Sequence, residues 1–499
     1  MKKWCKVFSI VFSLFFCLTI FAACGKFQEV KRASKGITSY EINVNIDDVN
    51  HEVSACQKVE VINNYDVELD SVCFNVYSRA FREEASVLPY TSLNEGKCFP
   101  NGVNYGDITI NSIKVDGVNI EYNYVGEDLN AINIPLNKNL APKDSVCVEI
   151  DYVVKLAECI HRLGYYNESI NLGNWFPILA IYENGEYVTS PYYSNGDPFY
   201  SDIANFKMSV TYPSEYYLSS SGNEKTIINN DGTKTDNIKA GAVRDFAIFL
   251  TKTEVTKSQK VDDILVSYVG YNQDENVDEV LNVATKAVKY FNETFGQYPY
   301  ETLDIVKAPF LHGGMEYPSV VIVSDSIANQ FDLTKVIVHE IAHQWWYAVV
   351  GNNEINEAWL DESLTEYSTI LFLSDHKEYD VTYEELVSEA FANYTLFADI
   401  ASTVHKKINT SMLLPVNKYN SEYEYSYMIY VKGVLLFDSI SQMVGKENIE
   451  KALKKYYKKF KFKIAKTDDL IGVIDNLTNK NVAAIMDSWL NGYAVIGSI

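Results

Sequence analysis

Two histidines stand four residues apart around a glutamate in the segment HEIAH, residues 339–343. On a helix, residues four apart lie on one face about one turn apart, so both imidazole rings can bind one metal ion. Glu340 follows the first histidine, where its carboxylate can reach a metal-bound water without binding the metal itself. We therefore predict His339 and His343 as zinc ligands and Glu340 as the catalytic base.

The third metal ligand has several candidates. A metzincin would continue as Gly-x-x-His, but Trp346 and Val349 occupy those positions. A thermolysin-like protease would place its glutamate at Ser363, which cannot serve. Glu362, separated from His343 by eighteen residues, falls where zinc enzymes of the aminopeptidase type keep their carboxylate. With Glu362 as third ligand, two imidazoles and one carboxylate leave a fourth position open, which is typical of catalytic zinc.

Other acidic residues lie close to this segment. Glu354 and Glu357 are nearer rivals for the third ligand, but their Asn- and Glu-rich connection is typical of a solvated loop. Glu366, one turn after Glu362, can orient a ligand histidine from outside the metal sphere, or it can belong to an exposed helix face. No cysteine occurs in this part of the chain, so a metal here must use nitrogen and oxygen ligands.

Four separated motifs resemble the zinc aminopeptidases of the aminopeptidase N family. HEIAHQWW (339–346) and WLDES (359–363) match its zinc signature, and HGGMEYP (312–318) is similar to its Gly-x-Met-Glu-Asn segment. YVKG (430–433) is similar to the segment that carries its oxyanion-stabilising tyrosine. The resemblance covers residues 255–499 closely and the preceding part loosely.

The resemblance implies one Zn²⁺ per chain and a substrate with a free N-terminus. It implies that Glu316 holds the substrate's amino group, with Gly313, Gly314 and Met315 in the same substrate-binding segment. It also implies that Tyr430 stabilises the oxyanion of the reaction.

Three features depart from the family pattern. Tyr317 stands where the family segment has Asn, and SNGDPFYSDIANF (194–206) stands roughly where relatives carry an Asp-Glu-Pro segment near the amino-group site. The sequence also shows no long helical region after the catalytic domain. We therefore expect a more open cleft than in many relatives.

The hydrophobic pattern changes along the chain. Residues 36–255 alternate with a period of two, as in Val146 to Val154, and contain an Asp116-Gly117 hairpin signal. Apolar residues from Val277 to Phe291 follow helical spacing and stop before Gly296. We predict a multidomain α+β chain: an N-terminal antiparallel β-sheet or sandwich domain (36–255), then a thermolysin-like, mainly α-helical zinc peptidase domain (256–499).

The N-terminus resembles a bacterial lipoprotein signal. Lys2, Lys3 and Lys6 precede an apolar stretch that ends in Phe21-Ala-Ala-Cys24, similar to a lipobox. We predict a signal peptide over residues 1–24, lipidation of Cys24, a linker over residues 25–35, and attachment to the outer face of the cell membrane.

The net charge and the cysteine content limit the possible partners and disulfides of the chain. A formal charge of −23 argues against nucleic acid as a partner. Five cysteines follow the signal, so at least one is unpaired: Cys56, Cys73, Cys98, Cys147 and Cys159. The leading function is removal of N-terminal residues from peptides. The alternatives are a zinc endopeptidase, a hydrolase of a non-peptide substrate such as an epoxide, and a retired peptide-binding surface lipoprotein.

Overall fold

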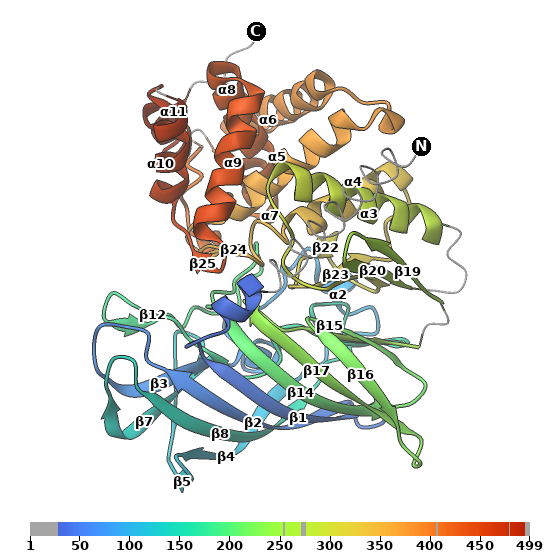
Figure 1. The fold of residues 1–499 in the computed structure, drawn as a ribbon, viewed down its shortest axis with the longest axis vertical. Helices are drawn as coiled ribbons and strands as arrows, with labels where there is room; N and C mark the ends of the chain where they lie inside the picture. The colour runs from blue at the N-terminus through green and yellow to red at the C-terminus, as the bar shows by residue number, and fades with distance from the viewer. Residues whose placement is uncertain (1–27, 253–254, 271–275, 406–407, 479, 495–499) are drawn as a thin grey trace, which may run out of the picture.

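The protein is described by a computed structural model that covers residues 28–252, 255–270, 276–405, 408–478 and 480–494. A β-rich part and a helical part are stacked on one another, as Figure 1 shows. Cys24 and the signal segment lie outside the described residues. Among the helices of those ranges, none has the length and apolar character that a membrane span requires.

An eight-stranded sheet forms the base of the β-rich part. Its strands alternate buried and exposed residues, as in β1, because successive side chains of a strand point to opposite faces. We predicted an antiparallel sheet, but the β1–β14 pair is parallel, so this sheet is mixed. In spatial order the strands are β16 (Asn223–Ile228), β17 (Thr233–Val243), β14 (Ala204–Pro213), β1 (Ser39–Asp47), β2 (Glu52–Ile62), β8 (Ser145–Lys155), β4 (Asp107–Val115) and β5 (Val118–Asn119).

The predicted hairpin joins β4 to β5. Asp116 and Gly117 form its turn with φ of 49° and 81°, a left-handed conformation that suits a two-residue hairpin loop.

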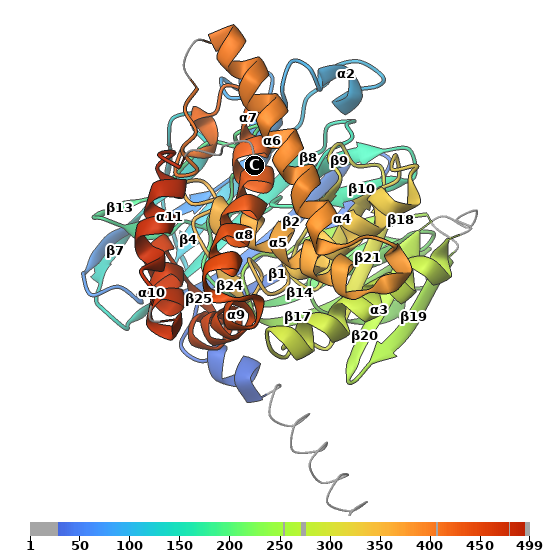
Figure 2. The same cartoon turned by 90° about the horizontal axis from the view of Figure 1, so that it is seen from above.

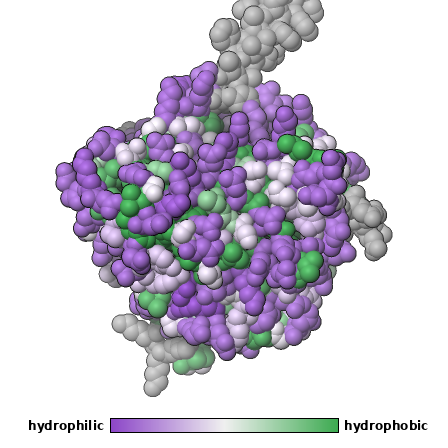
Figure 3. All heavy atoms as spheres, turned by 90° about the horizontal axis from the view of Figure 1, so that it is seen from below, coloured by the Kyte–Doolittle hydropathy of each residue, from purple (hydrophilic) through white to green (hydrophobic). Residues whose placement is uncertain are grey.

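Viewed from below, hydrophilic residues cover most of this side of the molecule and hydrophobic residues form smaller patches (Figure 3).

Two four-stranded sheets and a hairpin complete the β-rich part. One sheet contains β15 (Tyr217–Ser220), β18 (Ile248–Thr251), β10 (Ser169–Leu172) and β9 (Leu163–Tyr166). The other contains β11 (Ile178–Leu179), β3 (Leu69–Asn75), β7 (Ala131–Leu140) and β6 (Asn123–Val125). The hairpin pairs β12 (Tyr182–Glu183) with β13 (Glu186–Tyr187), and short helices η1 (Tyr77–Phe81) and α2 (Glu95–Cys98) lie in the connections.

The second part begins with a five-stranded sheet. Its order is β19 (Val255–Val261), β20 (Ile264–Gly270), β21 (Thr302–Ala308), β23 (Val320–Ser324) and β22 (Gly314–Met315). The strands β20, β21 and β23 are parallel, and the two-residue β22 pairs antiparallel at the edge. A further two-stranded pair joins β24 (Val350–Gly351) to β25 (Lys463–Ile464).

Helices make up most of this second part. They are α3 (Val277–Thr294), α4 (Gln330–Ala342), α5 (Trp359–Asp375), α6 (Tyr383–His405), α7 (Glu422–Ser426), α8 (Lys432–Val444), α9 (Lys446–Phe460), α10 (Thr467–Thr478) and α11 (Val482–Leu490), with shorter turns η2 (Lys377–Tyr379), η3 (Val416–Lys418) and η4 (Tyr427–Val431). The helix α3 ends just before Gly296, which has φ of 137°, as its apolar spacing predicts. A β-rich domain followed by a mainly helical one confirms the predicted fold class.

Contacts between the two parts are extensive. Tyr317 of the helical part donates to Asn174 of the β-rich part over 2.8 Å, and its ring lies 5.9 Å from that of Phe249. At the N-terminus, residues 28–33 within the predicted linker are helical, and Val30 packs against the main core. The β-rich part is thus packed against the helical part and forms one side of the cavity described below.

Candidate metal centre and catalytic site

Two helices place the predicted metal ligands. The Asn329 side chain caps α4 by accepting from the backbone N–H groups of Phe331 and Asp332. His339 and His343 lie at the C-terminal end of that helix, and Glu362 lies in the first turn of α5. Every residue of α5 from Trp359 to Leu373 is buried, so this helix is fixed by packing on all sides.

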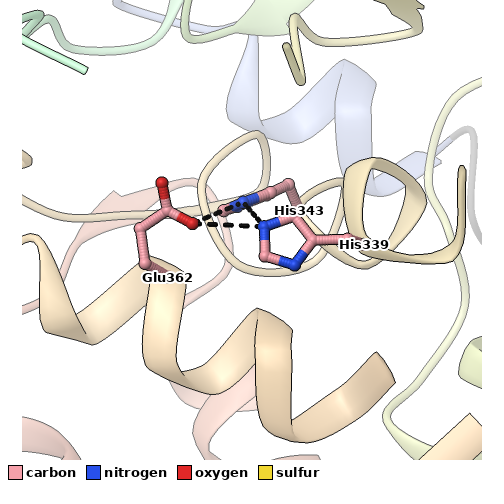
Figure 4. A group of neighbouring side chains, drawn as sticks. All are labelled: His339, His343 and Glu362. Carbon is pink, nitrogen blue, oxygen red and sulfur yellow. Dashed lines mark hydrogen bonds and ion pairs between the residues drawn. The ribbon is translucent and has the colours of Figure 1, made fainter. Parts of the chain in front are cut away.

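The three ligand atoms form a nearly equilateral triangle (Figure 4). The Nε2 atoms of His339 and His343 are 3.2 Å apart, and each lies 3.2 Å from Oε2 of Glu362. In a tetrahedral zinc site with bonds of about 2.0–2.1 Å, ligand atoms are about 3.3 Å apart. The donor set and its spacing therefore fit a Zn²⁺ ion with one open position.

Hydrogen bonds fix the tautomers of both histidines. Nδ1 of His343 lies 2.9 Å from the carbonyl oxygen of Trp346, which can only accept, so this nitrogen carries the proton. Nδ1 of His339 lies 3.0 Å from Oε2 of Glu366, whose other oxygen is 2.8 Å from Nζ of Lys335. Both Nε2 atoms are thereby left to bind a metal.

Burial and charge act in opposite directions on the three ligand side chains. Burial opposes charge on the His339 imidazole, but hydrogen bonds to Glu362 and Glu366 raise its pKa to about 9. Burial likewise opposes the Glu362 carboxylate, but the two imidazoles hold its pKa well below the usual range. A metal ion bound here would replace protons held by the ligand side chains, because a metal binds these side chains in their deprotonated forms.

Glu340 points into the same space. Its side chain is 6% exposed, and Oε2 has no hydrogen-bond partner among the described residues. Burial raises the pKa of Glu340 to about 7, against the opposing effect of the imidazoles. A carboxylate with that pKa can accept and return a proton near neutral pH.

The edge strand β22 lies against Glu340. A Cβ atom added at Gly314 would be 2.4 Å from Oε1 and 2.6 Å from Cγ of Glu340, so only glycine fits there. Gly313 has no such constraint, since the nearest atom to an added Cβ is Cγ2 of Val336 at 3.5 Å. Both glycines and Glu316 line the cavity.

Met315 is placed differently from its neighbours. Successive side chains of a strand alternate, so Met315 faces the interior and is fully buried while Gly314 and Glu316 face the cavity. Its sulfur accepts from Nε of Arg162 over 3.1 Å. We expected Met315 in contact with substrate, but its side chain instead supports Arg162 from behind.

Glu316 offers an unpaired carboxylate oxygen. Its side chain is 3% exposed and Oε1 has no partner within the described structure. Burial raises the pKa of Glu316 well above its usual range, partly offset by the charge of His343. A cationic group that entered the cavity would favour the ionised carboxylate and pair with it.

Tyr430 reaches the ligand cluster from a third helical segment. It lies in the π-helical turn η4, and its hydroxyl donates to Oε1 of Glu362 over 2.5 Å. Gly433 holds this segment close to α5, because an added Cβ would be 2.4 Å from the Ser363 side chain. Burial and the nearby Glu362 charge raise the pKa of Tyr430 well above 10, so the phenol remains a donor.

Arg162 and Asp197 complete the cavity from the β-rich part. Their side chains form a buried ion pair, 6% and 9% exposed, and both line the cavity. Asp197 belongs to the SNGDPFYSDIANF segment. In the sequence, Asp197 was marked only by the position of this segment, which corresponds roughly to a family segment near the amino-group site. Nothing in the sequence marked Arg162, because only folding brings β9 and its flank to this place.

The cavity has a volume of about 430 Å³ and an acidic lining. Its carboxylates are Asp197, Glu316, Asp332, Glu340, Glu362, Glu366 and Glu422, and its cationic side chains are Arg162 and Lys335. This imbalance favours a divalent metal together with a cationic substrate group.

The connection before α5 is not the solvated loop that its composition predicts. Glu354 is 2% exposed and Asn352 is 4% exposed, and the latter donates to Asp361 over 2.7 Å. Packing buries this loop although not every polar group in it is paired, since Oε2 of Glu354 has no hydrogen-bond partner among the described residues. The three ligand atoms converge without Glu354 and Glu357, which lie outside the His339, His343 and Glu362 cluster.

None of the five cysteines after the signal forms a disulfide with another described cysteine. Cys56 is exposed, Cys147 is partly exposed, and Cys73, Cys98 and Cys159 are buried. None of them lines the cavity.

Comparison with known proteins agrees with this geometry. Residues 279–489 match the Peptidase family M1 domain. Aminopeptidase N of Lactobacillus helveticus is 25% identical over 433 residues, 82% of this chain and 49% of the relative. Aminopeptidase N of Lactobacillus delbrueckii subsp. lactis is 29% identical over 236 residues, 44% of this chain and 27% of the relative. The chain thus spans about half or less of the length of these curated relatives.

Solved structures share the whole fold. The M1 zinc metallopeptidase from Deinococcus radiodurans superposes with a TM-score of 0.66 at 13% identity, over 92% of this chain and 94% of that chain. A mutant of the same protein, described as bound to a Tyr-Ser-Ala substrate, superposes with a TM-score of 0.64 at 13% identity, over 92% and 94% of the two chains. Residues 279–489 thus match a peptidase family M1 domain, and the chain is similar in sequence to aminopeptidase N of two lactobacilli and in fold to an M1 zinc metallopeptidase.

Proposed function

We propose that this protein is a zinc-dependent aminopeptidase that removes N-terminal residues from peptides outside the cytoplasmic membrane. The observation that carries the proposal is the unpaired, buried Oε1 of Glu316 in the cavity that also holds the His339, His343 and Glu362 cluster. An α-ammonium group is the cation that every peptide with a free N-terminus supplies. Its pairing with Glu316 would place the first peptide bond beside the metal ligands.

Zinc held by the two imidazoles and Glu362 would supply a Lewis acid that polarises the scissile carbonyl and lowers the pKa of water. The other steps belong to side chains of the chain itself. Glu340 accepts the proton of the attacking water and returns it to the leaving amine. Tyr430 turns its hydroxyl from Glu362 to the carbonyl oxygen as negative charge grows there.

Arg162 contributes through the charge balance of the site. It holds Asp197 in an ion pair, so this second carboxylate near the metal ligands does not add an uncompensated charge. Glu316 and Glu340 are then the buried carboxylates of the cavity lining with an oxygen that has no partner among the described residues, and with Glu340 as the base, Glu316 is left for the substrate's amine. An N-acetylated peptide lacks the cation that this oxygen pairs with.

The proposed location rests on the N-terminal sequence. Lys2, Lys3 and Lys6, the apolar stretch and the lipobox-like ending support lipidation of Cys24 and attachment to the outer face of the cell membrane of a bacterium. Metabolic labelling with a radioactive fatty acid, compared between the wild type and Cys24→Ala, tests this part. Equal label on both proteins would contradict it.

The activity is tested with pairs of fluorogenic peptide amides, one free at the N-terminus and one acetylated. Cleavage of the free peptides alone, abolished by a zinc chelator and by Glu340→Gln, is the expected result. Glu316→Gln should lower kcat/KM on the order of a hundredfold, because a buried charge pair is lost. Glu422→Gln at the partly exposed rim of the cavity is the matched control and should change kcat/KM little.

Two outcomes would contradict the proposal. Equal cleavage of free and acetylated peptides would establish an endopeptidase. No turnover of either kind by a protein with stoichiometric zinc would indicate a non-peptide substrate or a retired enzyme.

A further inference from the structure

A concentration of positive charge lies outside the cavity lining. Between Lys451 and Lys463, seven of thirteen residues are lysine and none is acidic. The chain as a whole carries a net charge of −23, so this segment opposes the general sign of the surface. Most of it belongs to α9 and the rest leads into β25.

The helix α9 divides its residues sharply between two faces. Its apolar residues are buried in the protein core, namely Ile449, Ala452, Leu453, Tyr456, Tyr457 and Phe460. Four lysines are exposed in the i, i+1, i+4, i+5 pattern of one helical face, namely Lys454, Lys455, Lys458 and Lys459. Because the apolar face is already packed, α9 cannot insert that face into a lipid layer, and it offers a partner its exposed polar face, which from Lys451 onward carries lysines and no acidic residue.

These four lysines and the exposed Lys463 are called the basic face. Within the described ranges, none of the five forms an ion pair with a carboxylate. Lys454 donates to the backbone oxygen of Glu293 over 3.1 Å, and Lys463 donates to that of Lys459 over 3.3 Å. By contrast, the flanking Lys451 pairs with Glu447 over 2.8 Å. The charge of the basic face is therefore not neutralised within the protein.

The described chain begins beside the basic face. The helical residues 28–33 lie next to the end of α9 in Figures 1 and 2, and Glu29 forms an ion pair with Lys461. Three exposed cationic residues, Lys31, Arg32 and Lys35, extend the positive charge along this entry segment.

We infer that the basic face docks against an anionic phospholipid surface, with phosphate headgroups as its ligands. Clusters of lysine next to a membrane attachment point are held by such headgroups through electrostatic attraction. If Cys24 carries the lipid, the four residues to Gln28 span at most about 14 Å, which keeps α9 close to the bilayer. Screening over about 8 Å at physiological salt lets the local positive charge act before the distant negative charge is felt.

Docking through α9 also fixes the orientation of the molecule. The basic face would turn toward the lipid, while the cavity lining contains no residue of α9 and stays accessible to peptides. The inference does not depend on the proposed peptidase activity, since its tests measure contact with lipid.

The first test uses the full chain in vesicles of phosphatidylcholine alone or of equal parts phosphatidylcholine and phosphatidylglycerol. Amine-reactive labelling, resolved by mass spectrometry, measures the accessibility of each lysine. The five lysines of the basic face should react several-fold more slowly on the anionic vesicles only. Lys58 and Lys207, which are 58% and 62% exposed on the large sheet, should react equally on both. Equal labelling of the basic face on both vesicles would overturn the inference.

The second test uses the chain from Gln28 onward, which retains every described element, and measures sedimentation with the same vesicles. Replacing Lys454, Lys455, Lys458 and Lys459 by Gln should weaken binding to anionic vesicles by at least about tenfold. The control variant replaces four exposed lysines on strands of the β-rich part by Gln, namely Lys58, Lys138, Lys207 and Lys225. It therefore has the same net charge as the α9 variant. Its binding should match the wild type. Both variants should keep the wild-type melting temperature.

Three results would overturn the inference. Equal weakening by both variants would show that only net charge matters, and unchanged binding by the α9 variant would remove the basic face from the contact. Retention of the wild type on a heparin column without any binding to vesicles would indicate a different polyanion as partner.

Discussion

The contact between Gly314 and Glu340 makes the sharpest prediction for the catalytic site. Gly314→Ala adds a Cβ atom 2.6 Å from Cγ and 2.6 Å from Cδ of Glu340. Carbon atoms in ordinary contact are about 3.5–4.0 Å apart, so the overlap amounts to about 1 Å. The crowded atoms include the stem of the side chain, so the carboxylate must move by a similar distance or β22 must shift.

A displacement of that size has a known order of cost. A reacting group misplaced by about 1 Å can lose on the order of a hundredfold in rate, which corresponds to about 2.7 kcal/mol in the activation free energy. We therefore expect Gly314→Ala to lower kcat on free peptide amides on the order of a hundredfold. The backbone at Gly314 lies outside the left-handed region, so alanine adds no backbone strain of its own.

The adjacent glycine is a matched control for this prediction. At Gly313 the nearest atom to an added Cβ is 3.5 Å away, an ordinary contact, so Gly313→Ala should retain nearly full activity. The assay is kcat and KM for both variants, with zinc content and melting temperature measured alongside. Equal activity of the two variants, with full zinc content in each, would refute the argument that Gly314 sets the position of Glu340.

Three further predictions concern single side chains. Tyr430→Phe removes the oxyanion donor and should lower kcat on the order of 10²–10³-fold with little change in KM, and an unchanged kcat would contradict that role. Glu366→Gln weakens the hold on Nδ1 of His339 and should raise the zinc dissociation constant by about 10- to 100-fold, measured by competition with a chromogenic chelator; an unchanged constant would exclude this positioning role. Burial raises the pKa of Asp245 to about 6, above about 3.9 in the unfolded chain, so its contribution to stability is present below about pH 4 and is lost as the pH rises through 6. Asp245→Asn should remove this loss of about 3 kcal/mol, seen in urea unfolding at several pH values, and parallel pH profiles for the two proteins would contradict it.

Much of the fold follows from local patterns. The alternation from Val146 to Val154 predicts β8, because a strand exposes one face and buries the other. The apolar spacing that begins at Val277 predicts α3, because a helix buries one stripe. The parallel β1–β14 pairing was not predictable in this way, since a strand's own pattern does not name its partner.

The candidate site likewise has features that the sequence predicts and features that only the tertiary structure shows. The spacing of His339 and His343 implies two rings on one face of a helix, and the tertiary structure adds Glu362 at 3.2 Å from both. Composition predicts a solvated loop around Glu354, but packing buries it. The motif also does not indicate that the Met315 side chain faces the protein interior, where it is fully buried.

By itself, the sequence determined the periods of its helices and strands, the pair of histidines, and the motifs that resemble one family. These properties depend on residues close together in the chain, whose relative geometry the backbone imposes. Only the tertiary structure decided that Arg162 pairs with Asp197, that Gly314 touches Glu340, and that the five lysines of the basic face remain without acidic partners among the described residues. Those contacts join segments far apart in the chain, and the packing of the whole core selects them.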